Sequence, residues 1–160
     1  MKKREKQVRK KTVIGWNEFV ALPEWDIPKI KAKIDTGARS SALHVEQIEQ
    51  LPNNHLSFWV VLDKHKERKI KVVARVKRHG HVKSSHGETS GRFFVETKIR
   101  IGPVTRKIEL NLVDRGKMNF RMLLGRTALR GRFMIDVAYA GLLSQKKQKK
   151  RRWNENRDFI

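Results

Sequence analysis

The feature that most constrains the fold is a series of short segments in which apolar and polar residues alternate with a period of two. In residues 29–35, Ile30, Ala32 and Ile34 share one face and three lysines occupy the other. Three more stretches alternate in this way: residues 69–77, 93–101 and 107–113. Further apolar runs, rich in Val, Ile and Phe, occupy residues 12–16, 19–22 and 56–62. This periodicity is typical of half-buried β-strands, so we expect a mostly-β domain.

Helical signals are scarce in this sequence. Residues 38–51 could form one or two helical turns. Residues 125–131 predict a short helix, because Ala128 and Leu129 favour a helix and Gly131 can end it. Many short strands separated by turn residues indicate a barrel or a sandwich.

Basic residues are in large excess. The chain has 38 Lys and Arg against 16 Asp and Glu, a net charge of +22, and residues 1–11 and 145–152 each carry +6 of it. We interpret residues 1–11 and 145–160 as basic, solvated tails of a single domain at residues 12–144. Their charge would suit RNA, a ribosomal surface or an acidic peptide as a neighbour, and charge alone does not choose among these.

Cysteine is absent, which excludes disulfides, thiolate metal ligands and a cysteine nucleophile. No stretch is apolar over the length needed to cross a bilayer, and the first residues lack the apolar region of a secretory signal. The sequence therefore predicts a cytoplasmic protein without a membrane partner.

The alternating strand at residues 29–34 runs into the turn Asp35-Thr36-Gly37, which leaves a carboxylate at its tip. Aspartate and glycine are ordinary turn residues, so this tripeptide alone predicts only a turn. Its surroundings are more informative. The small-residue segment ARSSAL follows it, and about 90 residues later RMLLGRTALRG joins two leucines and a glycine to the predicted short helix.

Five segments, taken in order, resemble those of a known family. They are IGWNEFVALPE (14–24), KAKIDTGARSSALH (31–44), VKSSHGETSGRFFV (82–95), DRGKMNFRMLLGRTAL (114–129) and FMIDV (133–137). Together they are similar to the retropepsin-like aspartic peptidases. The closer resemblance is to a bacterial and archaeal branch labelled ATP-dependent zinc protease, which often accompanies the ligase that adds glutamates to a small-subunit ribosomal protein. The resemblance implies a closed acid-protease barrel, with one short helix after the Leu-Leu-Gly segment.

The resemblance also implies an aspartic peptidase with Asp35 as the catalytic acid, Thr36 locking the turn by hydrogen bonding and Gly37 allowing it. Aspartic peptidases need two adjacent carboxylates that share one proton. This chain has one such turn. The second group could be Asp35 of a second copy in a homodimer, Asp136, or a cation such as Lys33 or Arg126. For Asp136 we favour a structural turn acid.

The substrate implied by the resemblance is an acidic or glutamylated tail of a cytoplasmic, ribosome-associated protein. Candidate substrate contacts are Arg92, Arg115, Arg126, Ser84 and Ser85, because guanidinium groups bind carboxylates in two-point contacts. In this fold the arginine after the glycine commonly braces the turn, so for Arg126 we favour bracing over substrate contact.

Two other interpretations start from the histidines and from the basic and aromatic residues. His79 and His81, with His86 nearby, could bind zinc, but such spacing rarely makes a site, and we expect neither metal nor cofactor. The alternative function is a non-catalytic basic β module that binds RNA or ribosomes, for which the basic tails supply charge. Aromatic residues could supply stacking surfaces, and the tryptophans are Trp16, Trp25, Trp59 and Trp153.

Overall fold

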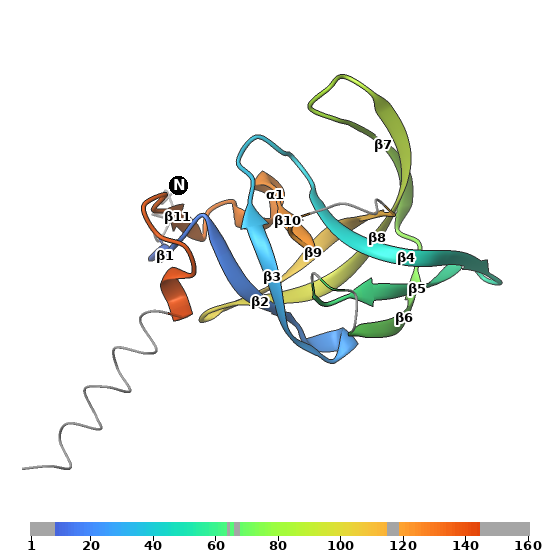
Figure 1. Cartoon of the computed structure of the whole chain (residues 1–160), viewed down its shortest axis with the longest axis horizontal. Coiled ribbons are helices and arrows are strands. Elements are labelled where there is room, and N and C mark those ends of the chain that lie inside the picture. The colour runs from blue at the N-terminus through green and yellow to red at the C-terminus, as the bar shows by residue number, and fades with distance from the viewer. Residues whose placement is uncertain (1–8, 64, 66–67, 115–118, 145–160) are drawn as a thin grey trace, which may run out of the picture.

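The structure is a computed structural model, and it describes residues 9–63, 65, 68–114 and 119–144 (Figure 1). Its strands are β1 (Thr12–Ile14), β2 (Asn17–Leu22), β3 (Ile27–Ile34), β4 (Ser41–Leu51), β5 (His55–Val61), β6 (Lys69–Arg75), β7 (Arg78–Lys83), β8 (Thr89–Ile101), β9 (Val104–Val113), β10 (Met122–Leu124) and β11 (Phe133–Ile135). Two short helices accompany them, the 3-10 helix η1 (Pro23–Trp25) and α1 (Arg126–Leu129). Arg115, Trp153 and most of the two basic tails lie outside the described residues.

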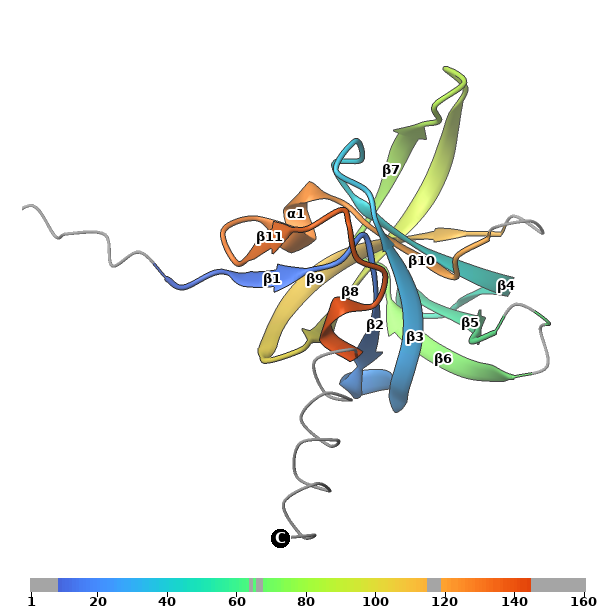
Figure 2. The ribbon, with the colours of Figure 1, turned by 60° about the vertical axis from the view of Figure 1, so that its left-hand side comes forward.

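Six of the strands pair into a closed ring. Their order is β10, β3, β2, β8, β9 and β4, and β4 pairs again with β10. Strands β5 and β6 extend the sheet from β4, while β1 and β11 form a separate parallel pair. Strand β7 pairs with the first half of β8, and this hairpin projects from the ring (Figures 1 and 2). The mostly-β fold predicted from the alternating segments is confirmed.

The alternation in β3 explains how the ring encloses its core. Ile30, Ala32 and Ile34 are buried in the main hydrophobic cluster, whereas Lys29 and the other two lysines of this strand face outward. The pattern in β8 has the same effect, since Val95, Ile99 and Ile101 are buried. One continuous core therefore lies inside the ring, and the polar faces of the strands remain outside.

Two local expectations need comment. Residues 38–51 were expected to hold helical turns, and this was wrong: residues 41–51 form β4. Ala, Leu, Glu and Gln favour helices, but β4 pairs with β9, β10 and β5 together, and this tertiary pairing outweighs local propensity. The short helix after the Leu-Leu-Gly segment is present as α1. Among the described residues, no helix has the length and apolar character needed to span a membrane.

Candidate active site

The turn after β3 holds Asp35 in a fixed orientation. The backbone N–H of Asp35 donates to the carbonyl oxygen of Leu124 at 2.9 Å, so the turn is tied to the end of β10. Within the turn, the N–H of Gly37 donates to Oδ1 of Asp35 at 3.0 Å, and the N–H of Ala38 donates to the Asp35 carbonyl at 3.3 Å. The carboxylate is half-buried. The position of Asp35 is therefore set by backbone contacts within its own turn and by one contact from the distant strand β10.

Strand β10 crosses between the two strands that the turn connects. Met122 pairs with Ala32 of β3 in parallel and with Leu43 of β4 in antiparallel orientation. At the end of β10, Gly125 approaches the chain leaving the turn so closely that a Cβ atom there would meet the backbone of Ser40. The N–H of Gly125 also donates to Oγ of Ser41 at 3.0 Å. The glycine is needed here because the two backbones touch.

Helix α1 continues this attachment. The N–H of Arg126 donates to the Ala38 carbonyl at 2.9 Å, and Thr127 donates to the Arg39 carbonyl through its N–H at 3.1 Å and its hydroxyl at 3.0 Å. The guanidinium of Arg126 donates to the Thr36 carbonyl at 3.0 Å. Arg126 thus occupies the bracing position favoured from the sequence, and Thr36 takes part in the bracing through its backbone oxygen.

Asp35 lines a groove of about 1140 Å³ between the turn, the β7–β8 hairpin and the outer face of β9. The sequence-predicted residues Ser84, Ser85 and Arg92 line the same groove, whereas Thr36 and Arg126 are not among its described lining residues. Ser84 closes the hairpin tip, where its Oγ accepts from the N–H of Glu88 at 3.3 Å. The structure therefore brings residues 35, 84, 85 and 92 to one concave surface.

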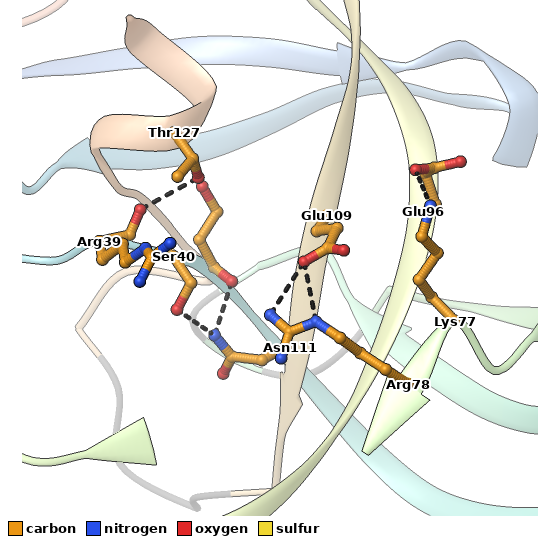
Figure 3. A network of polar contacts seen from close by, with 9 residues as sticks. Arg39, Ser40, Lys77, Arg78, Glu96, Glu109, Asn111 and Thr127 are labelled. Carbon is orange, nitrogen blue, oxygen red and sulfur yellow. Dashed lines mark hydrogen bonds and ion pairs between the residues drawn. The ribbon is translucent and has the colours of Figure 1, made fainter. Parts of the chain in front are cut away.

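Asn111, near the end of β9, organises the groove wall. Its side chain is 2% exposed and donates to the Ser41 carbonyl at 2.7 Å and to Oγ of Ser40 at 3.3 Å (Figure 3). Its Oδ1 accepts from Arg92 at 3.1 Å, and Arg92 also donates to Oγ of Ser90 at 3.0 Å. Arg92 therefore ties the hairpin to the strand beside the turn, and its orientation is fixed before any substrate arrives.

In the described part of the chain, two carboxylates besides Asp35 line the groove, and basic side chains hold both. Glu109 accepts from Arg78 at 3.2 and 3.0 Å (Figure 3). Glu96 accepts from Lys107 at 2.7 Å and from Lys77 at 2.8 Å, and these two hydrogen bonds lower the pKa of Glu96 below its ordinary value. Such ion-paired carboxylates are poor partners for sharing a proton with Asp35.

Of the in-chain candidates for the second catalytic group, Arg126 contacts the turn as a brace, and Asp136 and Lys33 are not among the described residues that line the groove. Oδ1 of Asp136 accepts from the N–H of Ala138 at 3.0 Å, while its own N–H donates to the Ile14 carbonyl at 2.8 Å. Asp136 is thus a turn residue beside β1, and it is not among the described residues that line the groove. Lys33 is exposed on the outer face of β3.

The histidines do not gather into a metal site within the described part of the chain, where no three His, Asp or Glu side chains converge. The ring of His79 packs edge-on against Phe93, with centroids 4.7 Å apart. His81 and His86 line the groove, and His44 is fully buried.

Sequence reasoning missed several residues of this groove. Asn111 and Glu109 fall on the polar face of the predicted strand at residues 107–113, so alternation could have placed them together. It could not show that this face looks onto the turn, because that depends on the parallel pairing of β9 with β4. Arg39 and Arg78 could not be singled out from the sequence, because they are two among 38 Lys and Arg residues.

Comparison with known proteins gives a consistent result. Residues 13–146 match a family model named RimB-like and described as the retropepsin-like aspartic endopeptidase RimB. Two curated relatives are named probable alpha-L-glutamate ligase. The one from Shewanella pealeana is 33% identical over 141 residues, which is 85% of this chain and 31% of the relative. The one from Desulfotalea psychrophila is 36% identical over 133 residues, or 80% and 28%.

The chain thus spans less than a third of the length of these curated relatives. A solved structure from Legionella pneumophila, of a protein with unknown function (DUF785), has a TM-score of 0.69 and 26% sequence identity. That likeness covers 84% of this chain and 99% of the Legionella chain.

Proposed function

The chain belongs to the RimB-like family of retropepsin-like aspartic endopeptidases, and on this basis we propose that it is an aspartic peptidase acting on an acidic or glutamylated protein tail. The observation that carries the proposal is the placement of Asp35. Its carboxylate lines a groove large enough for an extended peptide, on a turn that β10 and α1 hold from behind.

The proposed reaction is hydrolysis of a peptide or glutamyl bond by an activated water molecule. One carboxylate takes a proton from water while the water oxygen attacks the carbonyl carbon. A second, protonated carboxylic acid gives its proton to the carbonyl oxygen, and the amine leaves after proton transfer to its nitrogen. Two adjacent carboxyl groups can divide these roles because like charges at short range cannot both ionise easily.

We propose that the second carboxyl group is Asp35 of another copy of the chain. The groove carboxylates Glu96 and Glu109 are held by Lys and Arg side chains, and Asp136 belongs to a turn beside β1. A two-fold axis near the turn would bring the two Asp35 side chains together without any further residue.

The charge of the groove supports an acidic substrate. Among the described residues, five basic side chains line it against three acidic ones, and the basic ones are Arg39, Arg78, Lys83, Arg92 and Lys107. Arg78 and Lys107 are already paired with carboxylates. We propose Arg39 and Lys83 as contacts to substrate carboxylates, together with Arg92, whose guanidinium is held at the groove wall by Asn111 and Ser90.

The relatives' names point the same way, since proteins named as glutamate ligases share this domain over part of their length. A domain that trims glutamates would act on the same chain that such a ligase extends. A cytoplasmic, ribosome-associated protein with a glutamylated tail is the proposed substrate.

The test is hydrolysis of fluorogenic peptides that carry a run of glutamates, compared with matched glutamine peptides. Asp35→Asn should abolish cleavage, and it keeps an Oδ1 acceptor for the Gly37 N–H, so the turn is preserved. Asp136→Asn is the matched control and should retain activity. Mixing excess Asp35→Asn chain with wild type should inhibit the wild type, because mixed dimers carry one carboxylate. Undiminished cleavage by Asp35→Asn would refute the peptidase, and equal rates on both peptides would refute the acidic preference.

A further inference from the structure

A row of aromatic and lysine side chains lies on the outer face of β2 and β3. We call Trp16, Phe120, Lys31, Phe19 and Lys29 the aromatic–lysine row. The rings of Trp16 and Phe120 meet edge to face at 5.9 Å. The ammonium of Lys31 lies 5.7 Å from the Phe120 ring and 5.9 Å from the Phe19 ring, and that of Lys29 lies 4.1 Å from Phe19. The two rings at one end are therefore followed by a lysine, a third ring and a second lysine along one continuous surface.

Strand pairing explains why these side chains meet. Phe19 of β2 pairs directly with Lys31 of β3, so both side chains leave the same face of the sheet. Lys29 lies two residues earlier on β3 and therefore on that same face. Trp16 precedes β2 and Phe120 precedes β10, which pairs with β3. Two strand pairings and the start of β10 thus build the row.

The row is accessible and separate from the groove. Trp16 is 38% exposed and Phe19 is 39% exposed, which is unusual for rings of this size. None of the five residues is among the described residues that line the groove. The proposed peptidase site does not use this surface.

The charge of the row is uncompensated within the described part of the chain. The ion pairs described there lie on strands β4, β6, β7, β8 and β9 and in the loops that follow β5 and β6. None of them includes Lys29 or Lys31. Both ammonium groups lie over aromatic rings instead. Two cations held beside exposed rings form a surface that is attractive to an anion with flat apolar parts.

We propose that the aromatic–lysine row binds a single-stranded polynucleotide. Unpaired bases would stack on the rings of Phe19 and Trp16, and the lysines would move from the ring faces to the phosphates between the bases. Alternation of stacking surfaces and cations is how proteins bind single strands without reading their sequence. The net charge of +22 favours the encounter with any polyanion.

The geometry favours this ligand over a duplex or an anionic bilayer. A duplex keeps its bases stacked inside, so it cannot use the ring faces. Membrane-binding aromatic residues insert into the boundary between headgroups and acyl chains. The rings of this row instead lie along a sheet, with about three fifths of Trp16 and of Phe19 covered.

The test is fluorescence anisotropy of the full-length protein with a labelled oligouridylate of about 12 nucleotides, a length within known single-strand site sizes. Phe19→Ala should weaken binding about tenfold, the effect of losing one stacked base. The double variant Lys29→Gln/Lys31→Gln should reduce the slope of log K against log salt concentration by about 1.4, because two phosphate contacts are lost.

Matched controls come from another part of the sheet. Trp59 and Lys71 form an isolated ring and lysine pair, 6.0 Å apart, on β5 and β6. Trp59→Ala should leave the affinity unchanged, as should Lys98→Gln on the exposed face of β8.

Three results would overturn the proposal. Phe19→Ala and the double lysine variant could both bind like wild type, which would assign binding to other basic residues. A duplex of the same length could compete equally with the single strand, which would exclude stacking. Phe19→Ala could abolish self-association or binding to anionic vesicles without changing oligouridylate affinity, which would assign the row to a second copy or a bilayer.

Discussion

Replacing Gly125 with alanine should disrupt the crossing that holds the Asp35 turn. The backbone of Gly125 is extended, with φ −88° and ψ 178°, which alanine adopts without strain. The obstacle is contact alone. An added Cβ would meet the Ser40 carbonyl oxygen, would lie 2.7 Å from the Ser40 carbonyl carbon, and would lie 2.9 Å from the Ala38 oxygen. All three atoms are backbone, so no side chain can rotate away.

The expected cost follows from this geometry. Adding a methyl group to a packed interior costs roughly 1–3 kcal/mol, and three backbone contacts place Gly125→Ala at about 3 kcal/mol. For a domain of this size that loss lowers the midpoint of thermal unfolding by roughly 6–12 °C. Displacing residues 38–40 would also move Asp35. The rate of the proposed hydrolysis should therefore fall even under conditions in which the variant is fully folded.

Urea unfolding followed by tryptophan fluorescence measures the free-energy change. Gly91→Ala is the matched control: Gly91 is a β8 glycine whose added Cβ would meet nothing within 4 Å. It should be neutral or up to about 1 kcal/mol more stable than wild type, because alanine restricts the unfolded chain. If Gly125→Ala unfolds within about 0.5 kcal/mol of Gly91→Ala, then the two backbones are not in the close contact described, and the account of the turn is wrong.

Two further predictions concern β8. Thr97 is fully buried, and its hydroxyl has no hydrogen-bond partner among the described residues. Thr97→Val should therefore raise the free energy of unfolding by about 1 kcal/mol in the same assay. A lower free energy of unfolding in the variant would mean that the hydroxyl has a partner, which would contradict this reasoning. The lowered pKa of Glu96 means that its contribution to stability is present above its ordinary value of 4.5 and is lost as the pH falls through the lower folded-state pKa. Wild type should therefore exceed Glu96→Gln in stability at neutral pH, and the difference should shrink progressively as the pH falls below 4.5; a pH-independent difference would contradict the ion pairs.

The sequence predicted the parts of the site that depend on local pattern. Alternation in residues 29–34 placed Asp35 at the end of a strand with its apolar face inward, and the structure agrees. The pairing of β10 with β3 and β4 was not accessible to local reasoning, because three residues carry little periodic signal. Residues 41–51 misled, since their helix-forming composition was overridden by pairing with three strands.

The groove itself was beyond local reasoning. Asn111 and Arg92 are 19 positions apart, and Asn111 and Ser41 are 70 apart, yet hydrogen bonds join them beside the turn. Nothing in the neighbourhood of any one of them specifies these partners. They become neighbours only because β9 pairs with β8 on one side and with β4 on the other.

The hydrogen bond from Asp35 to Leu124 joins residues that a ribosome makes far apart in time. While residues 122–126 are still unmade or inside the exit tunnel, the turn at Asp35 lacks its hydrogen bond to Leu124. Strands β3 and β4 then also lack β10, which lies between them. A half-made chain would therefore carry the Asp35 carboxylate before the backbone that orients it has been made, so the proposed hydrolysis could begin only after residues 122–126 have joined the fold.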